Sequence, residues 1–168
     1  MRAAQIEGVQ FADSYTAGDT KLVLNCVGLL RYMVFIKGYV AALYLGEGVA
    51  ADAVLADVPK RLELNYFHAI RGPDFVNAGD QVMADNVDAA TIATLRPRIE
   101  QLDAWYEDVK PGDRYSLTYV PGKGTELALN GHPKGTIAGA DFAAAVFSIW
   151  LGPRPIDVSL KSQLLKCS

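Results

Sequence analysis

The longest β-rich stretch of the chain is LLRYMVFIKGYVAALYL, residues 29–45. Tyrosine, phenylalanine, valine and isoleucine recur in it, and these side chains favour strands over helices. Arg31 interrupts the apolar residues at its start. A guanidinium group that faces a core is costly unless an anion or a hydrogen-bond acceptor meets it. The stretch therefore predicts a buried β region and marks Arg31 as a candidate binding residue.

Two interpretations of Arg31 are open. Its fork of donors suits the two oxygens of a ligand carboxylate, and equally it can lie at a strand end and pair with one of the 19 acidic residues. Tyr39 has the same sequence parity, so on a regular strand it faces the same side. A straight strand would hold the two about 26 Å apart. They can serve one ligand only if the chain bends, and Gly38 is the expected place.

Working outward from this stretch, alternating and β-branched residues predict further strands. Residues 7–45 as a whole are interpreted as strands, and 61–67 alternate as a half-exposed strand does. Residues 114–120 and 125–130 form two more, joined by a turn at 121–124. Asn130-Gly131 tolerates positive φ angles and predicts a tight hairpin into residues 134–137.

Helical spacing of apolar residues predicts helices over the ranges 51–57, 73–86, 91–106, 140–151 and 157–165. Pro97 lies inside the third, where it predicts a kink or a break into two helices. The helix over 140–151 is apolar on nearly all sides, which indicates burial. Strands followed by helices give an α+β fold, and 168 residues suit one domain, 1–168.

The composition excludes several kinds of partner. Lys and Arg number 16 against 19 Asp and Glu, a net charge of -3, and no stretch concentrates the basic residues. Nucleic acid and anionic membrane surfaces need a dense positive patch, so neither is expected. The longest uncharged apolar run, residues 38–46, is about half of a bilayer-spanning helix. We expect a soluble protein without a transmembrane segment.

Residues for catalysis or metal binding do not cluster in the sequence. His68 and His132 are the only histidines, and neither has a carboxylate or cysteine at ligand spacing. No serine lies in a Gly-x-Ser-x-Gly turn. The segment 121–125, PGKGT, lacks the upstream glycine of a phosphate loop and is better interpreted as a hairpin turn. We expect no catalytic residue, metal or cofactor, so small-molecule binding is favoured over chemistry.

The two cysteines, Cys26 and Cys167, have no CxxC spacing and no neighbouring histidine. They can pair in an oxidising compartment or remain two small buried side chains, and their number does not decide between these.

Several motifs resemble chalcone isomerase-like proteins. Residues 25–32 and 35–45 look like the early strands of that family, and three later segments are similar to its bacterial branch: 121–125, 135–142 and 149–153. The resemblance covers residues 8–165. It implies a curved antiparallel sheet, covered on one face by helices, with a ligand cleft between them.

The resemblance also implies a function. The family contains isomerases that close a chalcone ring and non-catalytic relatives that bind fatty acids. The isomerases have an arginine matching Arg31 and a threonine where this chain has Tyr39, whereas the fatty-acid binders pair arginine with tyrosine. This chain follows the binders. The expected ligand is a fatty acid or similar amphipathic carboxylate, held by Arg31 and Tyr39 against a wall of Phe142, Val146 and Trp150.

Two alternatives stay open. One is an isomerase of the chalcone type, with Arg31 stabilising an enolate or phenolate. The other is a structural or partner-binding module whose cleft is filled by side chains. The first residues lack the apolar segment of a secretion signal, yet the resemblance implies a periplasmic protein whose leader has been removed; a cytoplasmic protein is the alternative. The sequence predicts neither the ligand's identity nor the oligomeric state.

Overall fold

A seven-stranded antiparallel sheet is the centre of the computed structural model, which describes residues 4–32 and 35–167. Each of its strands pairs with the next along the chain, and a separate two-stranded hairpin precedes it. The hairpin is β1 (Ala4–Ile6) and β2 (Val9–Phe11). The sheet contains β3 (Ser14–Ala17), β4 (Thr20–Tyr32), β5 (Ile36–Gly46), β6 (Lys60–Tyr66), β7 (Arg114–Val120), β8 (Gly124–Leu129) and β9 (His132–Ile137).

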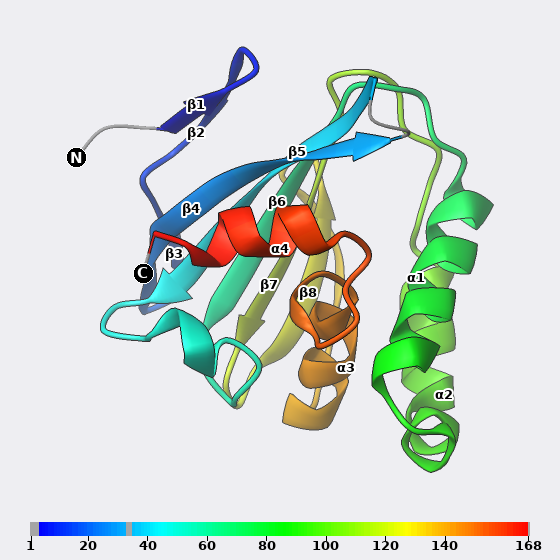
Figure 1. Cartoon of the computed structure of the whole chain (residues 1–168). Helices are drawn as coiled ribbons and strands as arrows, with labels where there is room; N and C mark the ends of the chain where they lie inside the picture. Colours follow the sequence, from blue (N-terminus) through cyan, green and yellow to red (C-terminus); the bar gives the residue numbers. More distant parts are fainter. Residues whose placement is uncertain (1–3, 33–34, 168) are drawn as a thin grey trace.

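Four α-helices cover one face of the curved sheet, as Figure 1 shows. They are α1 (Gly72–Asn86), α2 (Ala89–Asp103), α3 (Ala140–Leu151) and α4 (Val158–Leu165), and a 3₁₀ turn, η1, spans Ala51–Ala53. Aspartates cap two of them: Asp88 accepts from the backbone N–H of Thr91, and Asp157 from that of Leu160. The expected α+β fold, with helices on one face of a curved antiparallel sheet, is confirmed.

The long β-rich stretch is a hairpin and not one strand. Residues up to Tyr32 belong to β4 and those from Ile36 to β5, while Met33 and Val34 lie outside the described residues. Leu30 pairs with Tyr39, and the next pair is Arg31 with Lys37, so Gly38 is an extra residue in β5. The predicted irregularity at Gly38 is therefore confirmed, but as a bulge beside a chain reversal.

Two hydrophobic cores lie on the two faces of the sheet. The larger fills the space between the sheet and the helices, and the smaller is built around Phe11, Leu22, Val40, Ala42 and Tyr44. Strand β5 contributes alternate side chains to both, because the β1–β3 segment covers the face that the helices leave open. Its residues from Tyr39 onward are consequently buried on both sides.

The strand predicted over 61–67 is present as β6, but the prediction that it is half exposed is wrong, since every residue of β6 is buried. The polar face of β6 is satisfied by ion pairs: Glu63 accepts from Arg61 and Arg114, each at 2.9 Å. The Arg61 guanidinium also lies 3.6 Å from the centre of the Tyr15 ring on β3. The alternation of polar and apolar residues correctly assigned the side chains of β6 to the two faces of the sheet. It could not show that the β1–β3 segment covers the polar face.

The other elements agree closely with expectation. The hairpin turn between β7 and β8 is confirmed, as is the Asn130-Gly131 turn, where both residues have positive φ. The short helix expected over 51–57 is reduced to η1. Pro97 lies inside one helix, α2, so of the two predicted alternatives, a kink or a break into two helices, the break is excluded. Within the described residues, no helix has the length and apolarity needed to cross a membrane.

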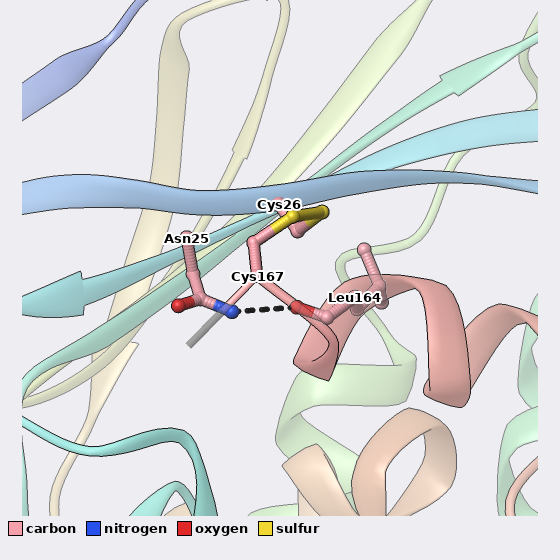
Figure 2. Close-up of a disulfide and its surroundings, with 4 residues drawn as sticks. All are labelled: Asn25, Cys26, Leu164 and Cys167. Atoms are coloured by element: carbon pink, nitrogen blue, oxygen red, sulfur yellow. Dashed lines mark hydrogen bonds between the residues drawn. A yellow bond between two sulfur atoms is a disulfide. The ribbon is translucent and has the colours of Figure 1, made fainter.

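A disulfide joins Cys26 of β4 to Cys167, just after α4 (Figure 2). Beside it, the side-chain amide of Asn25 donates to the carbonyl oxygen of Leu164 at 2.7 Å. Further along the same helix, Gln163 accepts from the N–H of Leu29 and donates to its carbonyl. These contacts fix α4 along β4, as Figure 1 also shows. Of the two states open to the cysteines, the structure has the paired one.

Candidate ligand-binding cavity

A cavity of about 190 Å³ lies between the sheet and the helices. Its walls are mostly apolar and aromatic. The sheet contributes Tyr39, Leu64, Tyr66, Tyr115, Leu117 and Leu127, and the helical side contributes Phe75, Met83, Leu102, Tyr106, Ile149 and Trp150. An apolar cavity with a few convergent polar groups is the usual form of a small-molecule site.

The volume limits what the cavity can hold in this conformation. An engineered cavity of about 150 Å³ is large enough for benzene, whereas pockets for drug-sized ligands span roughly 300–1,000 Å³. The cavity therefore accommodates a short apolar segment. A longer ligand must extend beyond it or displace its walls.

Rings packed edge to face stiffen one side of the cavity. Tyr66 of β6 is central: its ring centre lies 5.5 Å from that of Tyr39, 5.2 Å from Phe75 and 6.2 Å from Tyr115. The ring centres of Phe75 and Tyr106 are 5.4 Å apart. Aromatic pairs in these geometries add packing energy beyond the area they bury.

The rings of Phe75 and Tyr106 stack nearly parallel, with 18° between their planes, and they join α1 to the segment after α2. The Tyr115 hydroxyl is held by the backbone of Glu107, donating to its carbonyl and accepting from its N–H. This wall of the cavity is therefore fixed by contacts from three separate elements.

Tyr39 and Trp150 meet at the cavity wall. The indole Nε1 of Trp150 donates a hydrogen bond of 3.1 Å to the Tyr39 hydroxyl, and both side chains are buried. Burial raises the pKa of Tyr39 well above its ordinary value, so the phenol stays neutral. Its oxygen accepts from Trp150, which leaves the O–H able to donate to a ligand.

A pair of carboxyl groups lines the helical side of the cavity. Asp80 comes from α1 and Asp103 from the end of α2, and the two side chains hydrogen-bond to each other. Burial, and then the contact with Asp80, raise the pKa of Asp103 to about 8. The raised pKa favours the protonated form of Asp103 at neutral pH, and in that form its O–H can donate to Asp80. Of the residues that the structure describes, no lysine, arginine or histidine lines the cavity.

The structure places Arg31 outside the lining of this cavity. Its side chain is exposed at the end of β4, opposite Lys37. Lys37, and to a smaller extent Arg31, hold the pKa of Glu7 in the β1–β2 turn below its ordinary value. The expectation that Arg31 and Tyr39 face one side of a strand is wrong, because the chain reverses between them and Gly38 adds a residue.

The predicted wall residues divide into two groups. Trp150 lines the cavity, together with its neighbour Ile149. Phe142 and Val146 lie in the same helix, α3, but are fully buried in the core and are not among the residues that line the cavity. The helix thus presents only its C-terminal turn to the cavity.

Sequence reasoning missed the aspartate pair and the tyrosines beside it. A signal was present, because Asp80 follows Val76 by four residues and precedes Met83 by three, which places it on the apolar stripe of its helix. Asp103 follows Ile99 by four in the same way. Among the described residues, no group of three His, Cys, Asp or Glu side chains could hold a metal ion.

The sequence model of the chalcone isomerase-like family matches residues 3–166, nearly the whole chain. The chain belongs to the chalcone isomerase-like family. Its fold is similar to that of a fatty-acid binding protein from Arabidopsis thaliana, with a TM-score of 0.73 at 16% sequence identity. That match covers 98% of this chain and 96% of the plant chain. No curated protein matches the sequence.

At this level of identity the plant structure establishes the fold of this chalcone isomerase-like chain and not its ligand. The family resemblance expected from the early strands is confirmed. The cavity also lies where the resemblance implied a cleft, between the sheet and the helices.

Proposed function

We propose that this chalcone isomerase-like chain binds, without catalysis, a fatty acid or similar amphipathic carboxylate in the cavity between sheet and helices. The observation that carries the proposal is the apolar, aromatic cavity with the Tyr39 hydroxyl in its wall. A similar fold in a plant fatty-acid binding protein supports it. The cavity is not filled by side chains, which favours ligand binding over the closed structural module.

Tyr39 also bears on the isomerase alternative. The family's isomerases have a threonine at this position, and here the larger tyrosine side chain is engaged by Trp150. The proposal therefore takes Tyr39 as a hydrogen-bond donor to a ligand and assigns it no part in ring closure. Incubation with a chalcone substrate should give product without enantiomeric excess, and a clear excess would favour the isomerase.

Arg31 enters the proposal through the resemblance alone. Its guanidinium lies at the surface and outside the cavity lining, so the contact proposed for it is with the carboxylate of a ligand that has not yet entered the cavity. An exposed contact of this kind contributes about 0–1 kcal/mol. The apolar cavity, and not Arg31, supplies most of the binding free energy in this account.

The disulfide supports an oxidising compartment. Cys26 and Cys167 are paired, and such bonds persist mainly in secreted and periplasmic proteins. We accordingly propose the periplasm, which the family resemblance also implies.

Calorimetric titration with saturated fatty acids of increasing chain length tests the proposal. We expect one acid per chain and an affinity that rises with each added methylene until the cavity is filled, by up to about 0.8 kcal/mol per buried group. Absence of binding across the series would contradict the proposal.

A further inference from the structure

The polar side chains that line the cavity are either acidic or uncharged. Within residues 4–32 and 35–167, its charged lining residues are Asp74, Asp80 and Asp103, and the remaining polar side-chain groups are tyrosine hydroxyls and the Trp150 N–H. A carboxylate that entered this space would meet no cation and would lie near the charge that Asp80 and Asp103 share. In a region of low dielectric, that arrangement is strongly unfavourable.

Tyr66 provides a second, independent indication of a ligand. It lines the cavity and is 3% exposed. Among the described residues, the fully buried side-chain oxygen without a hydrogen-bond partner is Thr125 Oγ1 and not the Tyr66 hydroxyl, so the phenol O–H is placed to donate into the cavity. Its place among the lining residues makes a ligand in the cavity a suitable partner.

The tyrosines and the aspartates line one cavity. Burial raises the pKa of Tyr66, and the nearby Tyr39, Tyr106 and Tyr115 raise it further. Burial also raises the pKa of Tyr106, and Tyr115, Asp103 and Asp80 add to that rise. Tyrosines from β5 and β6 and carboxyl groups from α1 and α2 thus border the same cavity.

We propose that the head group admitted to this cavity is uncharged and donates a hydrogen bond to the Asp80–Asp103 pair, so that a fatty acid binds as its protonated acid. This inference rests on the proposed function and specifies the form of the ligand. The acid O–H donates to the carboxylate of the pair, and Tyr66 donates to the acid's carbonyl oxygen. A long-chain alcohol satisfies the same carboxylate without any change in protonation.

Other charges around the pair do not remove this requirement. On α2, Arg96 lowers the pKa of Asp103 and Glu100 raises it, and α1 adds Asp74. The lining residues from α3 and the segment after it, Ile149, Trp150 and Ile156, carry no charge. Among the described residues, the lining itself therefore contains no cation, and Arg96 acts on Asp103 from outside it.

Proton uptake on binding measures this directly. Decanoate and 1-decanol would be titrated into the intact chain by calorimetry, in buffers of different ionisation enthalpy. We expect about one proton taken up per decanoate near pH 7 and none per 1-decanol. Between about pH 6 and pH 8, decanoate affinity should fall by up to about tenfold per pH unit, while that of 1-decanol changes little.

The double variant Asp80→Asn with Asp103→Asn removes the negative charge but keeps two hydrogen-bonding side chains. It should bind decanoate at least about tenfold more tightly near pH 8 and take up fewer protons. Asp85→Asn, an exposed change on α1 outside the cavity, is the matched control and should behave like the parent chain. Each variant must first be shown to unfold cooperatively.

Decanoate binding without proton uptake in the parent chain would overturn the inference and leave the proposed function intact, even if the double variant failed to fold. A loss of more than about thirtyfold in Arg31→Ala would also overturn it, because the ligand would then be held as a carboxylate. Failure of both decanoate and 1-decanol to bind would instead contradict the proposed function.

Discussion

Trp150 donates a hydrogen bond of 3.1 Å to the Tyr39 hydroxyl and so joins α3 to β5 at the wall of the cavity. Both residues are buried, and the bond satisfies an indole N–H that would otherwise lack a partner. The contact therefore contributes to stability as well as shaping the proposed binding site.

Replacing Tyr39 by Phe should lower the free energy of unfolding by about 1–3 kcal/mol, because it leaves the Trp150 N–H buried without an acceptor. Adding Trp150→Phe removes the unpaired donor, so the double variant should lose less than the two single losses combined. Urea unfolding of the parent, both single variants and the double variant measures this coupling. Strict additivity would show that the bond has no energetic role.

Asp103→Asn should change the pH dependence of stability. The pKa of Asp103 is raised to about 8 in the folded state, compared with about 4 in the unfolded state. Asp103 therefore stabilises the fold fully below about pH 4, and this stabilisation is lost as pH rises through 8. Asparagine does not titrate, so the stability of the variant does not fall in this way. Its melting temperature relative to the parent should therefore be higher at about pH 8 than at about pH 5, by a few degrees.

Thermal melts across this range, with Asp85→Asn as control, test that prediction. Burial lowers the pKa of Lys60 to about 8, which gives stability an opposite slope at alkaline pH. Lys60 is present in both the parent chain and Asp103→Asn, so its effect on stability cancels when the two are compared. If the melting temperatures of the two chains changed in parallel with pH, Asp103 would titrate as an ordinary aspartate.

Removing the disulfide by Cys26→Ser with Cys167→Ser should lower the free energy of unfolding by about 2–4 kcal/mol. The bond closes a loop between residues 141 apart in sequence and holds the end of α4 against β4. Unfolding in denaturant, with and without a reducing agent, measures the loss. A reducing agent that destabilised the double variant as much as the parent would exclude the disulfide as the cause.

Arg31→Ala should weaken fatty-acid binding by less than about fivefold, since an exposed guanidinium contributes at most about 1 kcal/mol. Lys37→Ala, on the facing strand, is the matched change in charge. Calorimetric titration of both variants with decanoate compares them. A much larger loss in Arg31→Ala alone would restore the ionic clamp implied by the resemblance.

The fold was largely predictable because its patterns are local. Helical spacing correctly located α1, α3 and α4, and the Asn130-Gly131 pair located a hairpin. The reversal between Arg31 and Tyr39 escaped prediction because residues 32–36 include no Gly, Pro, Asn or Asp, the residues that usually mark a turn. Parity along a sequence fixes the face of a side chain only while the strand is regular.

The cavity was predictable only in part. Tyr39 and Trp150 were chosen in advance and both lie in its wall, whereas Asp80 and Asp103 are 23 residues apart in sequence and meet only because α1 and α2 lie side by side. Pairing of two helix faces is a tertiary contact, which the spacing within each helix does not specify.

Blocking the cavity tests the central claim most directly. Leu64 lines it and is 2% exposed, so Leu64→Phe should fill part of the space, whereas Val158→Phe changes an exposed residue outside the lining. Decanoate would be titrated into both variants and the parent after each is shown to unfold cooperatively. We expect Leu64→Phe to lose at least about tenfold in affinity, or about 1.4 kcal/mol, with Val158→Phe unchanged. Equal affinity in all three chains would contradict binding in this cavity.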